Sequence, residues 1–381
     1  MFTKKTSLLL TTLLFILTSC GFKEPIRIGF TASLTGRNAA LGVDGRNGAL
    51  LAVEHVNQAG GINGDLLELV IEDDLGTAEG ARVADRVLID AGVTAVIGHM
   101  TSDASIASWP EVKDSGMVFL SPTVSTPLLA GLDDNFFRLI AVNAYPAATL
   151  AEYASKELGL KKIAIFYDLD NFSYTDTYRN GFEIPFVYYG GQITESYAFR
   201  SSEQPDFAPL LYEVQAAETD GIFVIASAVD TALLAQQARL INLNIQILAS
   251  NWALTDDLIQ NGGHAVENIL TVVSHDENNQ SPGYLAFQAD FIERFGHAPT
   301  FAAGYGYEAV IVLASALEKT EGREEGLKEA LLKTKNFPGV HGTISMDPFG
   351  DVERTLYLVT VENGELKTIQ TTSYLTVFFS S

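Results

Sequence analysis

The amino-acid sequence predicts an α/β fold made of two doubly wound parallel-sheet lobes. Short apolar runs alternate with helix-length segments from residue 26 onward, and the loops between them are short. Apolar runs of this length are typical of strands that are buried on both faces. The same alternation restarts near Ala147 with a unit of similar size. Alternating strands and helices indicate a parallel sheet covered by helices, and the restart indicates a second one.

The first unit begins with an alternating strand, 26–30, which runs into a loop ending at Gly36. Apolar residues then recur at helical spacing over 43–58. Gly60 and Gly61 end that helix, because glycine readily adopts left-handed conformations. The unit is predicted to contain strands 26–30, 66–71, 94–98 and 117–121, and helices 43–58, 77–91 and 103–114.

The second unit repeats this architecture without an obvious sequence repeat. Its clearest strands are the apolar runs 162–166 and 221–225, each followed by a segment with helical periodicity. The unit is predicted to contain strands 162–166, 192–198, 221–225, 245–248 and 268–273, and helices 147–158, 174–186, 206–217 and 230–241.

The remainder of the chain is first helical and then strand-like. Helices are predicted at 283–295, 302–319 and 325–334, and alternation returns at 356–361 and 375–378. Asn363-Gly364 is a strong two-residue hairpin signal, so the tail is expected to form antiparallel strands. Periodicity does not assign these late segments to either unit.

The N-terminus resembles the leader of a bacterial lipoprotein. Lys4 and Lys5 precede a short apolar run that ends in Leu17-Thr-Ser-Cys20. A basic segment followed by so short a run is typical of a signal peptide, here 1–19, and not of a spanning helix. Cys20, the only cysteine, stands where such leaders are lipidated. The alternative is an ordinary secretory signal with an incidental cysteine.

Charge and composition limit the classes of partner. The formal net charge is −23, and removal of the leader with its two lysines makes it −25. So acidic a chain is not expected to bind nucleic acid or an anionic membrane surface. With one cysteine there is no disulfide, and the hydrophobic residues, 47% of the chain, supply the core.

Polar hydroxyls follow two neighbouring strands of the first unit. Ser102 comes after the strand at 94–98, and Ser125 comes after the strand at 117–121. In an open α/β sheet, ligands bind beyond the carboxyl ends of the strands, near helix N-termini. These serines are therefore candidate ligand contacts, although plain helix capping is the alternative. His99 is interpreted as a buried structural hydrogen-bonder.

The sequence offers no support for catalysis. It has no nucleophile elbow, no phosphate-binding loop, no zinc-protease motif and no Cys/His pair. Its histidines are scattered without metal-ligand spacing. We therefore expect neither an enzyme nor a protein that needs a metal or cofactor.

Five short motifs occur in order along the chain: Ile28-Gly-Phe-x-x-x-Leu34-Thr-Gly36, Asn57-x-x-Gly60-Gly61-Ile-x-Gly64, Asp73-Asp74, Val96-Ile-Gly-His99 and Ser121-Pro122. Together they resemble the leucine/isoleucine/valine-binding protein family, the type I periplasmic solute-binding proteins of ABC transporters. The resemblance covers about residues 26 to 362, and implies two lobes that are joined by a three-strand hinge and close on a small ligand. Lobe one would be 26–143 plus 276–352, and lobe two 144–275 plus 353–381.

The resemblance assigns one half of a ligand cradle to the first lobe. It implies ligand contacts from Met100 and Ser102 and from the segment Thr123, Val124 and Ser125. This half suits a carboxylate, because helix N-termini offer unpaired N–H groups and a partial positive charge.

The remaining positions of the ligand cradle carry residues that differ from the family's pattern. Phe172 and Ser227 of the second lobe stand at the positions of two tyrosines, and in the first loop of lobe one Leu41 replaces an aromatic residue. Asn251 stands where amino-acid-binding members place an acidic residue for the ligand's ammonium group. Asp170 or Asp230 could replace that acid, but the favoured interpretation of each is a solvated loop or helix-capping residue. Trp252 could line the cleft or the core. An amino acid, an amide, a urea-like compound or a carboxylate therefore all remain candidate ligands.

The sequence as a whole predicts a monomeric, lipid-anchored extracytoplasmic protein, in the periplasm or at the cell surface. It would capture a small polar ligand between two lobes and deliver it to ABC permease subunits. The alternative is a ligand-sensing module of a signalling system, since the same fold serves in both.

Overall fold

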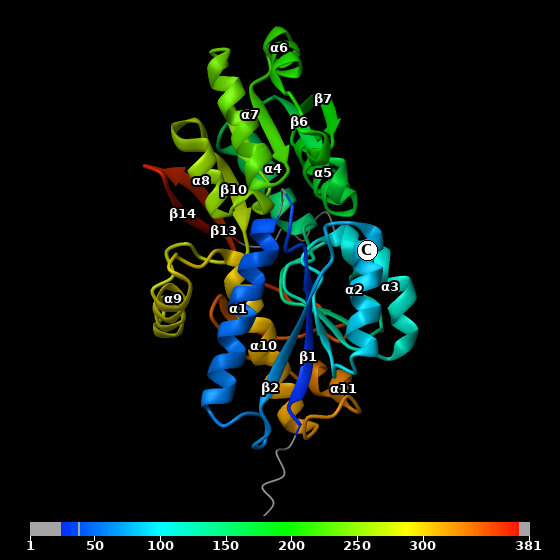
Figure 1. Cartoon of the computed structure of the whole chain (residues 1–381). Helices are drawn as coiled ribbons and strands as arrows, with labels where there is room; N and C mark the ends of the chain where they lie inside the picture. Colours follow the sequence, from blue (N-terminus) through cyan, green and yellow to red (C-terminus); the bar gives the residue numbers. More distant parts are fainter. Residues whose placement is uncertain (1–23, 37–38, 373–381) are drawn as a thin grey trace, which may run out of the picture.

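A computed structural model describes residues 24–36 and 39–372 of the chain. It contains two separate sheets, each covered by helices, stacked end to end along the long axis of the molecule (Figure 1). The predicted leader 1–19, Cys20 and the strand predicted at 375–378 lie outside the described residues. No helix within the described part is both long and apolar enough to cross a membrane.

The first sheet has five parallel strands in the order β2-β1-β3-β4-β5. The topology reverses direction between β1 and β3, which is where open α/β sheets bind ligands. The predicted strand at 94–98 pairs only over Val96–Ile97, and β5 was not predicted. The strands are β1 Ile26–Ala32, β2 Leu67–Asp73, β3 Val96–Ile97, β4 Phe119–Ser121 and β5 Phe136–Arg138.

Helices from two distant parts of the sequence cover this sheet. The helices α1 and α10 cross so closely that a Cβ atom on Gly48 of α1 would stand 1.9 Å from the carbonyl oxygen of Ala303 in α10. The backbones could not approach so closely with a larger residue there. The helices of this lobe are α1 Ala39–Gln58, α2 Ala78–Asp90, α3 Ser102–Val112, α9 Pro282–Phe295, α10 Phe301–Lys319 and α11 Leu327–Leu332. Of these, α9 packs against α1 and α10.

The second sheet has seven strands in the order β14-β13-β10-β9-β8-β6-β7. The five strands from β6 to β10 are parallel, and β13 joins antiparallel to β10. The strands are β6 Lys162–Asp168, β7 Gln192–Phe199, β8 Gly221–Ile225, β9 Gln246–Ala249, β10 Leu270–Val273, β13 Leu356–Glu362 and β14 Glu365–Thr372.

Helices also cover the second sheet, and α8 among them was not predicted. They are α4 Ala144–Lys156, α5 Phe172–Tyr188, α6 Ala208–Ala216, α7 Ala228–Leu240 and α8 Asp256–Gly262. A small hairpin, β11 Phe337–Gly339 with β12 Gly342–Ile344, lies outside both sheets.

The predicted hairpin at the tail is confirmed. Asn363 and Gly364 have φ angles of 56° and 74°, as a type I′ turn requires. They join β13 to β14, which pair antiparallel. The strand β14 itself was not predicted, because polar residues interrupt its alternation.

The chain passes between the two sheets three times: after β5, after β10, and before β13. Arg354, in the third passage, donates through Nε to the carbonyl oxygen of Leu139 in the first, at 2.8 Å. Its guanidinium also pairs at 2.6 Å with Glu308 of α10. Both charged groups are buried, so this ion pair holds the passages together. The two-lobe α/β architecture is as predicted, while the residue boundaries of the lobes stay a prediction.

Candidate ligand-binding site

A small pocket lies between the two lobes, beyond the carboxyl ends of their strands. It encloses about 20 Å³, which is room for about one water molecule. The first lobe supplies the residues that follow β3 and β4 and the starts of α1 and α10. The second supplies the start of α5 and the short helix η5, Asn251–Ala253. The lining residues are Leu41, Met100, Ser102, Thr123, Asn171, Tyr174, Asn251, Trp252 and Phe301.

The first-lobe wall presents a helix N-terminus and two hydroxyls. Ser102 is the first residue of α3 and is 2% exposed. Its hydroxyl has no hydrogen-bond partner among the described residues. Thr123 donates its hydroxyl to the carbonyl oxygen of Met100 at 2.6 Å. A buried hydroxyl without a partner is costly, so Ser102 is suited to receive a ligand atom.

The second-lobe wall is aromatic and amide-rich. Tyr174 donates its hydroxyl to Oδ1 of Asn251 at 2.7 Å and packs edge-on against Trp252, with ring centroids 5.8 Å apart. Burial raises the pKa of the Tyr174 hydroxyl far above its usual range, so it stays protonated and acts as a donor. No Asp, Glu, Lys, Arg or His is among the nine lining residues. The side chains that line the pocket are therefore all neutral.

Four of the eight residues proposed from the sequence lie together in this pocket: Met100, Ser102, Thr123 and Asn251. The other four lie outside its lining. Val124 is fully buried in the core behind it, and Ser125 is buried with a hydroxyl that has no partner in the described part of the chain. The side chain of Phe172 is 46% exposed. Ser227 caps α7 and lines an adjoining pocket with Leu41, Trp252 and Asp257.

Three lining residues were not anticipated from the sequence: Asn171, Tyr174 and Phe301. Asn171 and Tyr174 lie within two positions of Phe172, the residue that was predicted in this part of the chain. Phe301 starts α10, and no local pattern separates its apolar side chain from a core residue. Trp252, for which both locations were considered, lines the pocket.

The two aspartates considered as ammonium partners are engaged elsewhere. Asp170 accepts from Arg200 at 2.9 Å and from the backbone N–H of Ser202 at 2.8 Å. Asp230 is buried and accepts from the hydroxyl of Ser227 at 2.8 Å. Neither lines the pocket.

His99 lies directly before the pocket segment and is buried between two carboxylates. Its Nδ1 lies 2.8 Å from Asp74, and its Nε2 lies 3.2 Å from Asp85. Burial opposes protonation, but the two carboxylates outweigh it and raise the pKa of His99 to about 9. The imidazolium thus joins the ends of β2 and β3 to α2, which is the structural role expected of it. No group of three or more metal-ligating side chains occurs in the described residues.

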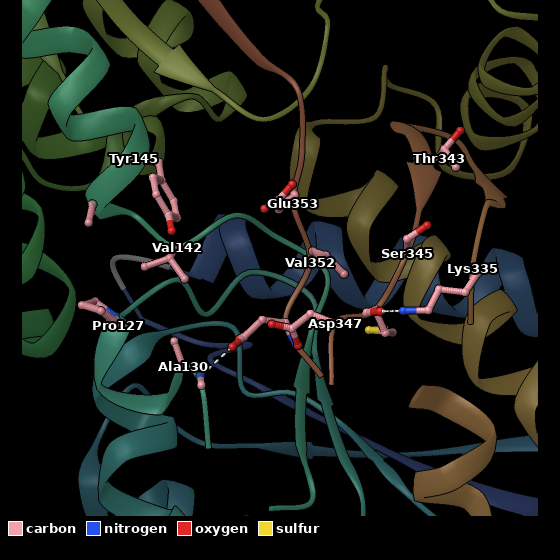
Figure 2. A pocket seen from close by; sticks show the side chains of 14 residues that line it. Pro127, Ala130, Val142, Tyr145, Lys335, Thr343, Ser345, Asp347, Val352 and Glu353 are labelled. Carbon is pink, nitrogen blue, oxygen red and sulfur yellow. Dashed lines mark hydrogen bonds between the residues drawn. The ribbon is translucent and has the colours of Figure 1, made fainter. Parts of the chain in front are cut away.

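A much larger cavity lies elsewhere, beside the passages between the lobes, and measures about 1080 Å³. Figure 2 shows its lining, which includes Tyr145, Lys335 and Glu353 from three separate segments. Asp351 in this groove is already paired with Arg138 at 2.6 Å and accepts from the N–H of Gly131. The groove therefore lies where the chain passes between the lobes, and its size alone does not make it the ligand site.

Comparison with known proteins agrees with this architecture. The family model described as periplasmic binding protein matches residues 25–365, most of the chain. The chain belongs to the leucine/isoleucine/valine-binding protein family. This family comprises type I periplasmic binding proteins, which bind solutes and are not enzymes. Membership implies a location outside the cytoplasm.

Individual family members resemble the chain over most of their length. The Leu/Ile/Val-binding protein BraC3 of Rhizobium johnstonii is 28% identical, over 86% of this chain and 89% of its own. The leucine-binding protein LivK of Thermotoga maritima has a TM-score of 0.84 and 28% identity, covering 91% of this chain and 98% of its own. LivJ of Streptococcus pneumoniae, solved in complex with isoleucine, has a TM-score of 0.84 and 25% identity, covering 92% and 100%.

Proposed function

We propose that this protein is the extracytoplasmic solute-binding lipoprotein of an ABC importer. It captures a small polar ligand, an amino acid, an amide or a related carboxylate, in the pocket between its lobes. The observation that carries the proposal is the buried hydroxyl of Ser102 at the N-terminus of α3, which has no partner among the described residues and lines a pocket with Asn171 and Asn251 of the second lobe. Family membership supports the transport role.

Capture works by a shift of population between open and closed arrangements of the lobes. The enclosed space of about 20 Å³ is too small for an organic ligand, so the walls must move apart to admit one. A ligand that contacts Ser102 on one lobe and Asn251 on the other then favours the closed arrangement, because it interacts with both walls only there. The permease subunits recognise the closed, loaded monomer.

A carboxylate fits the first-lobe wall on energetic grounds. The dipole of a helix contributes at most about 2 kcal/mol to binding an anion, and each hydrogen bond to a charged group contributes about 1.5–3 kcal/mol. Several such bonds together approach the roughly 8 kcal/mol of micromolar affinity. Isoleucine is the ligand in the LivJ complex, which makes branched amino acids the first compounds to test.

The lipid anchor is part of the same proposal. Lipidation at Cys20 after removal of residues 1–19 would tether the protein beside its permease, because several acyl chains together hold a protein stably on a membrane. The acidic remainder of the chain would stay in the aqueous phase.

A thermal-shift screen tests the proposal. The purified protein is heated with amino acids, their amides, ureas, and aliphatic and aromatic carboxylates, each at millimolar concentration. A compound that binds the folded state alone raises Tm, and we expect a rise of several degrees with at least one of these classes. If no class raises Tm, or if the bound compound is turned over, the proposed function is wrong.

A further inference from the structure

The helices α3 and α5 belong to different lobes (Figure 1), and hydrogen bonds join their N-terminal ends. The carboxylate of Asp103, in the first turn of α3, reaches the start of α5. Its Oδ2 accepts from the backbone N–H of Phe172 at 2.7 Å, and its Oδ1 accepts from that of Ser173 at 2.7 Å. The first N–H groups of a helix have no partner within the helix, so Asp103 satisfies two of them.

The contact is reciprocal. Asn171, the N-cap residue of α5, accepts through its Oδ1 from the backbone N–H of Asp103 at 3.1 Å. Within the described residues neither helix has a side-chain cap from its own N-cap residue, which is Thr101 for α3 and Asn171 for α5. Each helix is instead capped by the other lobe. We call these three hydrogen bonds the interlobe clasp.

The clasp forms only when the lobes are close. A carboxylate at a helix N-terminus is stabilised by the helix dipole and makes short, charge-assisted hydrogen bonds. Separation of the lobes removes both helix caps at once. The closed arrangement is therefore favoured by bonds that do not involve a ligand.

The clasp is continuous with the pocket, although Asp103 does not line it. Ser102, the residue before Asp103, and Asn171, its partner, both line the pocket. We propose that Asp103 is a positioning residue for ligand capture, which retains the ligand by capping α5 from the opposite lobe. Its effect on affinity rests on the function proposed above, whereas its effect on lobe closure does not.

Small-angle scattering of the ligand-free protein tests closure directly. We compare the unaltered chain with Asp103→Ala, which removes both acceptor oxygens, and with Asp103→Asn, which keeps the size but loses the charge. Asp114→Asn is the control, because Asp114 is an exposed aspartate just beyond the other end of α3. We expect a larger radius of gyration for Asp103→Ala, an intermediate value for Asp103→Asn, and no change for the control. Identical scattering from all four proteins would overturn the proposal.

Ligand dissociation provides the second measurement, with isoleucine as the probe. We expect Asp103→Asn to raise the dissociation rate about three- to tenfold with little change in the association rate, because the clasp acts after the ligand has entered. If isoleucine binds all variants equally, the clasp has no role in retention. If it binds none of them, including the unaltered chain, the choice of ligand is wrong, and the scattering result still decides whether the clasp closes the lobes. If Asp103→Ala fails to fold, the comparison of Asp103→Asn with the unaltered chain tests the proposal by itself.

Discussion

Ser102 and Ser125 are two buried serines whose hydroxyls have no partner within the described residues, yet only Ser102 lines the pocket. Because only one of them lines the pocket, the alanine substitution of Ser125 can serve as the control for that of Ser102. A hydroxyl that is kept buried and unpaired costs stability unless something else uses it, and at Ser102 the proposed use is the ligand.

We therefore predict that Ser102→Ala weakens ligand binding about tenfold or more, because a hydrogen bond to a charged group is worth about 1.5–3 kcal/mol. The free energy of unfolding without ligand should not fall, since an unsatisfied group is removed. Titration calorimetry and urea unfolding measure the two effects. Ser125→Ala is the control and should affect binding less; the reverse order would mean that the cleft is misplaced.

Asn251 is the lining residue that we propose decides whether a ligand with an ammonium group is accepted. It accepts from Tyr174, and no ionised side chain lines the pocket with it. An ammonium group buried without an opposite charge is strongly disfavoured, so the neutral amide fits a ligand without one better than an acidic residue would.

We accordingly expect Asn251→Asp to shift the ligand preference of the protein from carboxylates without an amino group toward amino acids. The comparison uses isoleucine and 3-methylpentanoate, which differ only by the amino group. The ratio of their dissociation constants should move about tenfold in favour of isoleucine, and the hydroxyl of Tyr174 can still donate to the new carboxylate. An unchanged ratio would show that the residue at 251 does not meet the ligand's amino group.

At the scale of elements, the buried imidazole of His99 links β3 to β2 and α2 through Asp74 and Asp85. Its pKa is raised to about 9, because the two carboxylates outweigh the opposing effect of burial. A group whose pKa is higher in the folded state than the ordinary 6.5 stabilises the fold fully below about pH 6.5. That stabilisation is lost as the pH rises toward 9.

We predict that Tm of the unaltered chain falls between pH 6 and pH 9.5 by more than that of His99→Asn. The variant should be less stable at pH 6, because it leaves two buried carboxylates without their cation. Differential scanning calorimetry at a series of pH values measures both effects. Parallel pH profiles for the two proteins would contradict the assignment of the proton to His99.

The elements themselves show which signals in the sequence are reliable. The tail hairpin was predictable, because Asn363-Gly364 suits a turn that needs positive φ at both residues. The strands β5 and β14 and the helix α8 were missed. The strand β5 has three residues, too few to show a period, and α8 has seven, so their conformations depend on neighbours more than on local pattern.

At the scale of the whole molecule, two lobes meet over a pocket and are connected by three passages of the chain. The buried pair of Arg354 and Glu308, with the bond to Leu139, keeps the passages together. The clasp is a further contact between the lobes and joins the starts of α3 and α5. Bending about the passages would break the clasp while leaving both sheets intact.

Membrane attachment also belongs to this scale. We predict that Cys20→Ala releases the protein from the membrane fraction, since lipidation requires the thiol and the acyl chains provide the anchorage. Fractionation followed by immunoblotting measures the release, and the control is Ser19→Ala, which keeps the cysteine. Retention of Cys20→Ala in the membrane fraction would contradict a lipid anchor.

The sequence by itself determined the two-lobe α/β class, most strands and helices, the hairpin turn and three first-lobe residues of the pocket, Met100, Ser102 and Thr123. These follow from periodicity, turn chemistry and motifs, which are all read within a short stretch of chain. Only the tertiary structure decided that Tyr174 and Phe301 complete the pocket and that Asp103 caps α5. Those contacts join residues far apart in the sequence, such as Asp103 and Phe172, and they depend on how one lobe faces the other, which no local pattern records.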